Sequence, residues 1–230
     1  MRHPDQPELA AVVDAFEAAV LGQEPVAAEH YDEEYFASDW RAGDNRYDLD
    51  TRRRIEGRNP QLIHDVFQPA RVLDLGCGPG FLMQLLHELG VDVRGVDYAE
   101  ASRDLAPPDV RDRISIASVT DPQVEAGAFD LVICREVLEH MTVLEVRQTV
   151  REICRASSRY AYVTTRYHPE PSSLLDFTTQ FDVDPSHITL LAKDFLRVLF
   201  VLEGFRRRPD LEEQMDWGDK NRVLVYERAV

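Results

Sequence analysis

The chain lacks the features that mark membrane and secreted proteins. No apolar run in it approaches the length needed to cross a bilayer. Residues Met1 to Asp5 contain no hydrophobic segment of the kind found in a secretory signal. The three cysteines are odd in number and fall inside predicted elements, so we do not expect a disulfide framework. We therefore expect a cytoplasmic protein with reduced thiols and no contact with a membrane.

Positive charge is also scarce. The chain has 26 lysines and arginines against 42 aspartates and glutamates, which gives a formal net charge of −16. A surface of this sign repels a phosphate backbone and offers no counterion release to drive polynucleotide binding. The short basic clusters, Arg52 to Arg54 and Arg206 to Arg208, cannot reverse the overall field. We therefore expect no nucleic-acid partner.

Internal repeats and low-complexity tracts are absent, whereas apolar residues are plentiful. The 230 residues are 44% hydrophobic, which is enough for one core. We expect a single domain over residues 1–230, with an N-terminal helical cap at 1–68 and a core at 69–230. Spacing and end signals predict helices over residues 9–21 and 55–67 and from near Lys193. They predict later strands at residues 114–119, 129–134 and 160–165.

The most informative local pattern is an apolar strand that leads through a glycine turn into a helix. Residues 71–75 form the strand, and Gly76, Gly78 and Gly80 follow it. Glycines allow positive φ angles and remove the Cβ atoms that would keep a ligand from the backbone. The pattern predicts a nucleotide-like cofactor lying against bare amides. The alternative is a tight turn that serves the fold alone.

The next strand ends in an acid. Residues 91–96 alternate in polarity and are followed by Asp97, which places a carboxylate at the same sheet edge as the glycine turn. A carboxylate there can accept both hydroxyls of a ribose. The alternative role for Asp97 is the N-cap of the following helix.

Three segments together resemble the successive motifs of class I S-adenosylmethionine-dependent methyltransferases of the small-molecule type. They are Asp74 to Gly80, Gly95 to Tyr98 and Phe129 to Cys134. The turn reads Gly-x-Gly-x-Gly after an aspartate, whereas a nicotinamide-binding dehydrogenase would usually show Gly-x-Gly-x-x-Gly. The resemblance is specific over about residues 70–165 and looser over the rest, where it includes a final strand at residues 222–227. It implies an α/β fold with a Rossmann-like, seven-stranded, mostly parallel sheet flanked by helices, and S-adenosylmethionine as the methyl donor.

The resemblance also implies which residues contact the donor. Ser118 stands where the family usually has an acid against the adenine, so the chain departs from the pattern there. One of Arg52 to Arg54 is expected to meet the methionine carboxylate. The expected cofactor contacts are Asp74, Gly76, Cys77, Gly78, Gly80, Asp97, Tyr98, Ser118, Val119 and Arg135.

The segment after the fourth strand has two interpretations. His140 can act as general base toward a substrate hydroxyl, and His187 is a second candidate base. Alternatively, Glu136, Glu139 and His140 resemble the Glu-x-x-Glu-His segment of magnesium-dependent ubiquinone-pathway methyltransferases and of small-RNA terminal-ribose methyltransferases. A divalent ion such as Mg²⁺ would then take a further ligand from His168 or His187. Solvated or paired carboxylates are the alternative to a metal site.

Aromatic residues gather in two segments expected to enclose the ligands. Tyr31, Tyr35, Phe36, Trp40 and Tyr47 resemble the N-terminal cap that many small-molecule methyltransferases fold over the cofactor, although ordinary packing is an equal alternative. Residues 166–191 form a long connection that we interpret as a substrate lid. The predicted substrate-binding residues are Tyr35, Tyr167, His168 and Phe181.

The sequence therefore predicts an S-adenosylmethionine-dependent methyltransferase that acts on a small molecule. We expect O-methylation of a hydroxyl in a sugar or secondary metabolite, with release of S-adenosylhomocysteine. The alternatives are N-methylation, a catalytically silent donor-binding protein and a nicotinamide enzyme. A homodimer is compatible with the sequence, which does not identify the acceptor.

Overall fold

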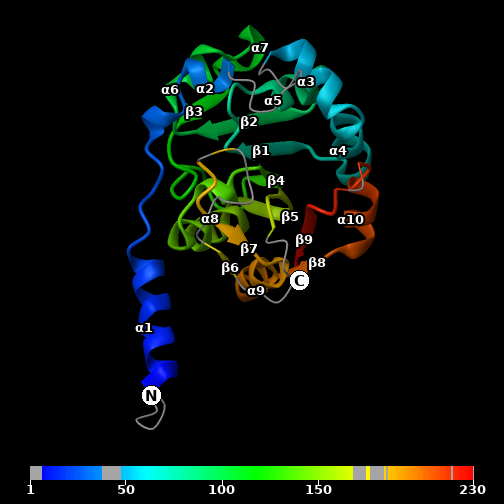
Figure 1. Cartoon of the computed structure of the whole chain (residues 1–230). Coiled ribbons are helices and arrows are strands. Elements are labelled where there is room, and N and C mark those ends of the chain that lie inside the picture. The colour runs from blue at the N-terminus through cyan, green and yellow to red at the C-terminus, as the bar shows by residue number, and fades with distance from the viewer. Residues whose placement is uncertain are drawn as a thin grey trace.

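The computed structural model describes residues 7–37, 48–167, 175–176, 184, 186–218 and 220–229. Within them, a seven-stranded sheet has the order β3-β2-β1-β4-β5-β9-β8 (Figure 1). Only β9 runs against its neighbours, because it pairs antiparallel with both β5 and β8. The strands are β1 (Arg71–Leu75), β2 (Asp92–Asp97), β3 (Ile114–Ile116), β4 (Phe129–Arg135), β5 (Ser157–Thr164), β8 (Phe205–Arg207) and β9 (Val223–Arg228). The expected α/β, mostly parallel sheet is confirmed.

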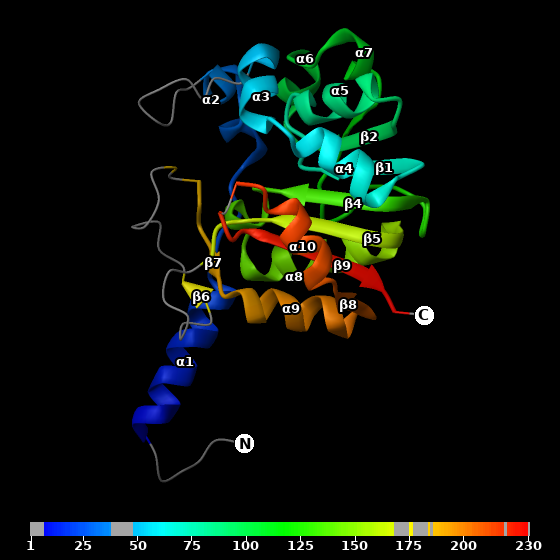
Figure 2. The ribbon, with the colours of Figure 1, turned by 90° about the vertical axis from the view of Figure 1, so that its right-hand side faces the viewer.

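Helices cover both faces of this sheet. Figure 1 shows α8 on one side and α4 and α10 on the other. The helices are α1 (Pro7–Leu21), α2 (Glu33–Ala37), α3 (Leu49–Glu56), α4 (Asn59–Phe67), α5 (Phe81–Glu88), α6 (Glu100–Asp104), α7 (Pro108–Arg111), α8 (Val143–Ala156), α9 (Lys193–Leu202) and α10 (Pro209–Met215), with short 3₁₀ turns η1 (Ala28–His30) and η2 (Leu138–His140). Helix α1 projects away from the body in both views (Figures 1 and 2).

The central strands are apolar on both faces because each face has its own core. In β1, Leu73 packs into the cluster beneath α8 and α9, whereas Val72 packs into the cluster beneath α4, α5 and α10. In β4, Val132 packs into the cluster beneath α8 and α9, and Leu131 packs into the cluster on the opposite face. Strands buried on both faces therefore read as continuous apolar runs, which made β1 and β4 recognisable from sequence.

Two predicted elements were wrong in extent. The helix expected over residues 55–67 is broken, because α3 ends at Glu56 and α4 begins at Asn59. Between them Gly57 has a φ of 52°, and a Cβ there would lie 2.9 Å from the Trp217 ring. The strand expected over residues 114–119 ends at Ile116, so β3 is shorter than predicted.

The connection after β4 turns sharply at the carboxyl edge of the sheet. It passes through η2 and enters α8 at a capping box, in which Thr142 Oγ1 accepts from Glu145 N at 3.2 Å and Glu145 Oε2 accepts from Thr142 N at 2.9 Å. The long connection after β5 contains a small ribbon of β6 (Leu175–Asp176) and β7 (Leu190–Leu191). Among the described residues, none of the helices combines the length and apolar character that crossing a bilayer requires.

Candidate functional site

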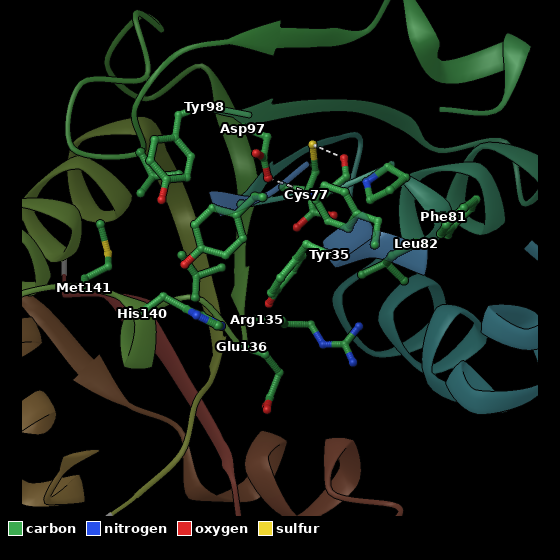
Figure 3. A pocket seen from close by; sticks show the side chains of 18 of the residues that line it. Tyr35, Cys77, Phe81, Leu82, Asp97, Tyr98, Arg135, Glu136, His140 and Met141 are labelled. Carbon is green, nitrogen blue, oxygen red and sulfur yellow. Dashed lines mark hydrogen bonds between the residues drawn. The ribbon is translucent and has the colours of Figure 1, made fainter. Parts of the chain in front are cut away.

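A cavity of about 220 Å³ opens at the carboxyl ends of β1, β2 and β4 (Figure 3). This is where ligands bind in open parallel sheets. Nine of the ten expected cofactor contacts line it: Asp74, Gly76, Cys77, Gly78, Asp97, Tyr98, Ser118, Val119 and Arg135. Gly80 does not line it, because it is the N-cap of α5 and is buried with a φ of 70°.

The amide groups of the glycine turn form hydrogen bonds within the protein, so the turn shapes the cavity without offering it unpaired donors. Gly76 N donates to Val96 O at 2.8 Å, Gly78 N donates to Asp97 Oδ2 at 2.9 Å, and Gly80 N donates to Cys77 O at 3.1 Å. The expectation of unoccupied amides is therefore wrong, because these donors hold the turn together and tie it to β2. What the turn offers a ligand is space: a Cβ on Gly78 would meet only Phe36, at 3.5 Å.

Asp97 faces the cavity and also accepts hydrogen bonds from the backbone on either side of it. Its Oδ2 accepts from Gly78 N and its Oδ1 accepts from Ala99 N at 3.0 Å. Burial raises its pKa. A carboxylate has about four lone-pair sites, so both oxygens can still accept from hydroxyl groups. The N-cap alternative is not borne out, because Ala99 is the N-cap of α6.

A partly buried ion pair borders the cavity. Arg135 Nη1 lies 2.9 Å from Glu56 Oε2, which also accepts from Asn59 Nδ2 at 2.9 Å. Burial alone would raise the pKa of Glu56, but the Arg135 guanidinium and Asn59 hold that pKa below its usual value. Asp74 lies on the same cavity wall, and burial raises its pKa to about 7.

Replacing Arg135 by methionine should lower the free energy of unfolding by about 3 kcal/mol, because it removes the guanidinium that pairs with the buried Glu56 carboxylate. Urea unfolding followed by circular dichroism measures this change. The Arg135→Met, Glu56→Gln double variant should recover most of the loss. Arg53→Met is the matched control, since it breaks the exposed Arg53–Glu88 pair, 2.7 Å long, and should cost less than about 1 kcal/mol. Equal losses for the two single variants would contradict the prediction.

A second cavity, of about 300 Å³, adjoins the first. The two share Tyr35, Arg52, Glu56, Arg135, Glu136 and His140 among their lining residues. The aromatic cap borders the first cavity through Tyr31, Tyr35 and Phe36, while Trp40 and Tyr47 lie outside the described residues. Tyr35 Oη donates to Asp184 Oδ2 at 3.2 Å, so the cap contacts the far end of the expected lid.

A chain of hydrogen bonds orients His140 at the junction of the cavities. Ser186 Oγ donates to Asp184 Oδ1 at 2.6 Å and lies 2.8 Å from His140 Nδ1. Because the serine proton is committed to the carboxylate, His140 Nδ1 must carry a proton and donate to Ser186. This assigns the remaining lone pair of the imidazole to Nε2. Burial and the neighbouring His187 lower the pKa of His140 to about 3, so the ring is neutral.

Glu139, His140 and His187 form a compact cluster of metal-ligating groups. One ligand atom from each lies within 4.8 Å of the others. Glu139 is 1% exposed; its Oε2 accepts from Thr165 Oγ1 at 2.7 Å, and its Oε1 has no hydrogen-bond partner among the described residues. Burial and the nearby Glu136 carboxylate raise the pKa of Glu139 to about 8. A buried carboxylate oxygen without a partner, beside two imidazoles, fits a bound cation.

Other expected site residues lie elsewhere. Glu136 is outside the metal-ligating cluster, because its Oε2 faces Arg222 at 3.2 Å and Arg166 at 3.7 Å. Tyr167 lines neither cavity; its ring packs on the hydrophobic core, with Lys193 Nζ 5.0 Å from its centroid. Of the basic cluster, Arg52 lines both cavities, whereas Arg53 pairs with Glu88. His168 and Phe181 lie outside the described residues.

Several residues of the site had no signal in the sequence. Ser186, Arg166 and Arg222 belong to no recognisable motif, and each reaches the site through contacts across the fold. Gln23 is another, because its amide donates to Ile188 O at 3.1 Å and to Thr189 Oγ1 at 2.6 Å and accepts from Val143 N at 2.9 Å. It fastens the chain beside His187 to the start of α8.

Comparison with known proteins assigns the chain to a family. The family model described as a methyltransferase domain matches residues 47–207, which is more than half of the chain. A ubiquinone biosynthesis O-methyltransferase from Bordetella avium is 39% identical over 87 residues, which cover 35% of this chain and 36% of that protein. The chain thus matches about a third of the length of the curated relatives.

Solved structures share the fold. A SAM-dependent methyltransferase from Archaeoglobus fulgidus matches with a TM-score of 0.60 and 15% identity, over 85% of this chain and 97% of that one. Magnesium protoporphyrin IX methyltransferase from Synechocystis, with SAM bound, matches with a TM-score of 0.57 and 18% identity. The match covers 90% of this chain and 100% of that one. The chain therefore belongs to the methyltransferase-domain family, which confirms the resemblance to S-adenosylmethionine-dependent methyltransferases.

Proposed function

We propose that the protein transfers a methyl group from S-adenosylmethionine to a hydroxyl group of a small molecule. The observation that carries the proposal is the pair of adjoining cavities, which share His140, Arg135 and Glu136 at their junction. One cavity has the glycine turn and the acid of a donor site. The other has polar walls suited to an acceptor. The reacting groups would meet where the two cavities join, so that positioning supplies most of the catalysis.

In the first cavity, Asp97 would accept the ribose hydroxyls and Gly78 would let the donor approach the turn. Ser118 and Val119 line the cavity from the segment after β3, where the adenine would lie. Arg52 stands beside the partly buried Arg135–Glu56 pair and would meet the methionine carboxylate. The aromatic residues of the cap would close over the donor and exclude water.

The metal-ligating cluster supports participation of a divalent cation. Glu139, His140 and His187 would hold it, and their two imidazole nitrogens and one carboxylate favour a transition metal such as Mn²⁺ or Zn²⁺ over the expected Mg²⁺. When bound, such an ion acts as a Lewis acid that lowers the pKa of a hydroxyl it contacts. The low pKa of His140 favours its role as a ligand over that of a strong general base. Asp184 and Ser186 would keep His140 Nε2 directed to that role.

Transfer of labelled methyl from S-adenosylmethionine to a metabolite extract, with Mn²⁺ present, tests the proposal. We expect one or a few labelled small molecules, and mass spectrometry of the product separates O-methylation from N-methylation. Calorimetry with S-adenosylhomocysteine and with NAD is the accompanying measurement. Binding of S-adenosylhomocysteine without a labelled product would support the catalytically silent alternative. Binding of NAD alone would support a nicotinamide enzyme.

A further inference from the structure

Helix α1 is apolar in composition but largely exposed to solvent. Eleven of its 15 residues are apolar, and its charged residues are three acids. The side chains described in it, from residue 14 to residue 21, are exposed or half-buried, and they include Phe16 at 45% and Leu21 at 73%. An isolated helix of this length is marginal in water, and a helix with apolar residues on every side is normally buried. Helix α1 therefore needs a surface to pack against.

Helix α9 exposes an apolar stripe on the outside of the molecule. Val198, Val201 and Leu202 are 55%, 61% and 74% exposed, and their spacing of three and four residues places them on one side of the helix. The opposite side of α9 packs Leu196 and Phe200 into the core. Single exposed apolar side chains are ordinary, whereas a contiguous group of them marks a surface that contacts another partner.

Helix α8 adds positive charge beside this stripe. It packs against α9, and Arg151 Nε lies 3.7 Å from Glu203 Oε1, at the end of α9. Arg147 is exposed and lies one turn before Arg151 on the same side of α8. Within the described part of the chain, neither Arg147 nor the exposed Glu17 of α1 has an ion-pair partner. We define the α8–α9 face as Arg147, Arg151, Val198, Val201 and Leu202.

Helix α1 and the α8–α9 face are complementary in two respects. Both expose apolar side chains, and the acids of α1 are opposite in charge to the arginines of the face. Helices that lie on membranes usually carry lysine or arginine on their polar side, and α1 has neither. A basic and apolar protein surface therefore fits α1 better than a lipid surface does.

The attachment of α1 directs it away from the α8–α9 face of its own chain. Gln23, just after the helix, donates to Thr189 Oγ1 at 2.6 Å and accepts from Val143 N at 2.9 Å. The base of α1 is thus fixed beside the start of α8, and the helix, about 22 Å long, extends outward from there. Figure 1 shows α1 and α9 apart. A second copy, related by a two-fold axis, can present its α8–α9 face to this helix.

We infer that α1 packs on the α8–α9 face of a second copy of this chain, so that two copies exchange their N-terminal helices. Each copy gives one helix and receives one, which closes the assembly as a dimer. The exchange buries the apolar side chains of both surfaces and brings Glu17 to a basic face. The inference concerns assembly and goes beyond the proposed function, since it does not depend on methyl transfer.

Sedimentation velocity over a range of protein concentrations tests the inference. We expect a dimer of two 26.3 kDa chains. Phe16→Glu and Val198→Glu each place a charge in the apolar contact and should raise the dimer dissociation constant about tenfold or more. Arg147→Glu should also raise it, because it reverses the charge that faces α1. Leu105→Glu is the matched control, since Leu105 is 38% exposed at the end of α6, and it should leave the dimer unchanged.

The four substituted side chains are exposed, so circular dichroism should show that all variants remain folded. A mixture of the Phe16→Glu and Val198→Glu chains then tests the exchange itself. In either variant alone, both helix contacts contain one altered surface. In the mixed dimer, one contact has two unaltered surfaces, so the mixture should dimerise more strongly than either variant alone.

Three results would overturn the inference. A monomer at every concentration would mean that α1 does not bind a second copy, and its sedimentation with phosphatidylcholine vesicles would assign α1 to a membrane surface. A dimer that Val198→Glu leaves intact would mean that α1 contacts another surface. A mixture no stronger than the two variants would exclude the exchange. Calorimetry with S-adenosylhomocysteine reports on the proposed function separately, so the two failures are distinguishable.

Discussion

Gly78→Leu should weaken binding of S-adenosylhomocysteine by about 100-fold or more, while the protein stays folded. The Cβ position of Gly78 meets only Phe36, at an ordinary contact distance of 3.5 Å, and Gly78 lines the first cavity, which we propose for the donor. A leucine side chain would therefore occupy the volume proposed for the donor rather than clash with the protein. The φ of 51° adds backbone strain of about 1–3 kcal/mol. Calorimetry measures the affinity, and circular dichroism measures the fold.

The chain offers a matched control for this substitution. Gly90 also has a positive φ, of 85°, and nothing lies within 4 Å of its Cβ position. It lines neither cavity, so Gly90→Leu imposes comparable strain without entering the donor site. We expect it to lower stability and to leave the affinity for S-adenosylhomocysteine unchanged. If both leucine variants bind this ligand equally well, the donor does not lie against the glycine turn.

Glu139→Gln should lower methyl transfer by about 100-fold and weaken Mn²⁺ binding by a similar factor, because it removes the anionic ligand of the metal-ligating cluster. The amide has the shape of the carboxylate, and its oxygen can still accept from Thr165. Glu139 does not line the first cavity, which we propose for the donor, so affinity for S-adenosylhomocysteine should be retained. Labelled methyl transfer and calorimetry with Mn²⁺ measure the two effects.

Removal of metal should have the same effect as this variant. Dialysis of the parent protein against a chelator should lower methyl transfer by about 100-fold or more, and added Mn²⁺ should restore it. Glu125→Gln changes an exposed glutamate outside both cavities and serves as the control. Unchanged Mn²⁺ affinity and unchanged turnover in Glu139→Gln would mean that Glu139 is buried for structural reasons alone.

The part of the site predicted from sequence is the part made by short, continuous segments. Residues 71–80 contain a buried strand and its glycine turn, and Asp97 directly follows the adjacent strand. Parallel pairing of β1 with β2 then brings the turn and the acid together, because the carboxyl ends of parallel strands meet at one edge. The sequence did not reveal that the amides of the turn donate to Val96 and Asp97. These hydrogen bonds depend on the position of β2 beside the turn.

The sequence alone predicted the sheet, the family and most of the expected residues that line the first cavity, because alternation, glycine positions and strand ends are local properties of the chain. Only the tertiary structure showed the second cavity and the contacts around it. His140 meets Ser186 across 46 residues and Glu136 meets Arg222 across 86, while Tyr167, expected at the substrate, packs on the core. Contacts between such distant segments depend on the packing of whole elements, which no short pattern encodes.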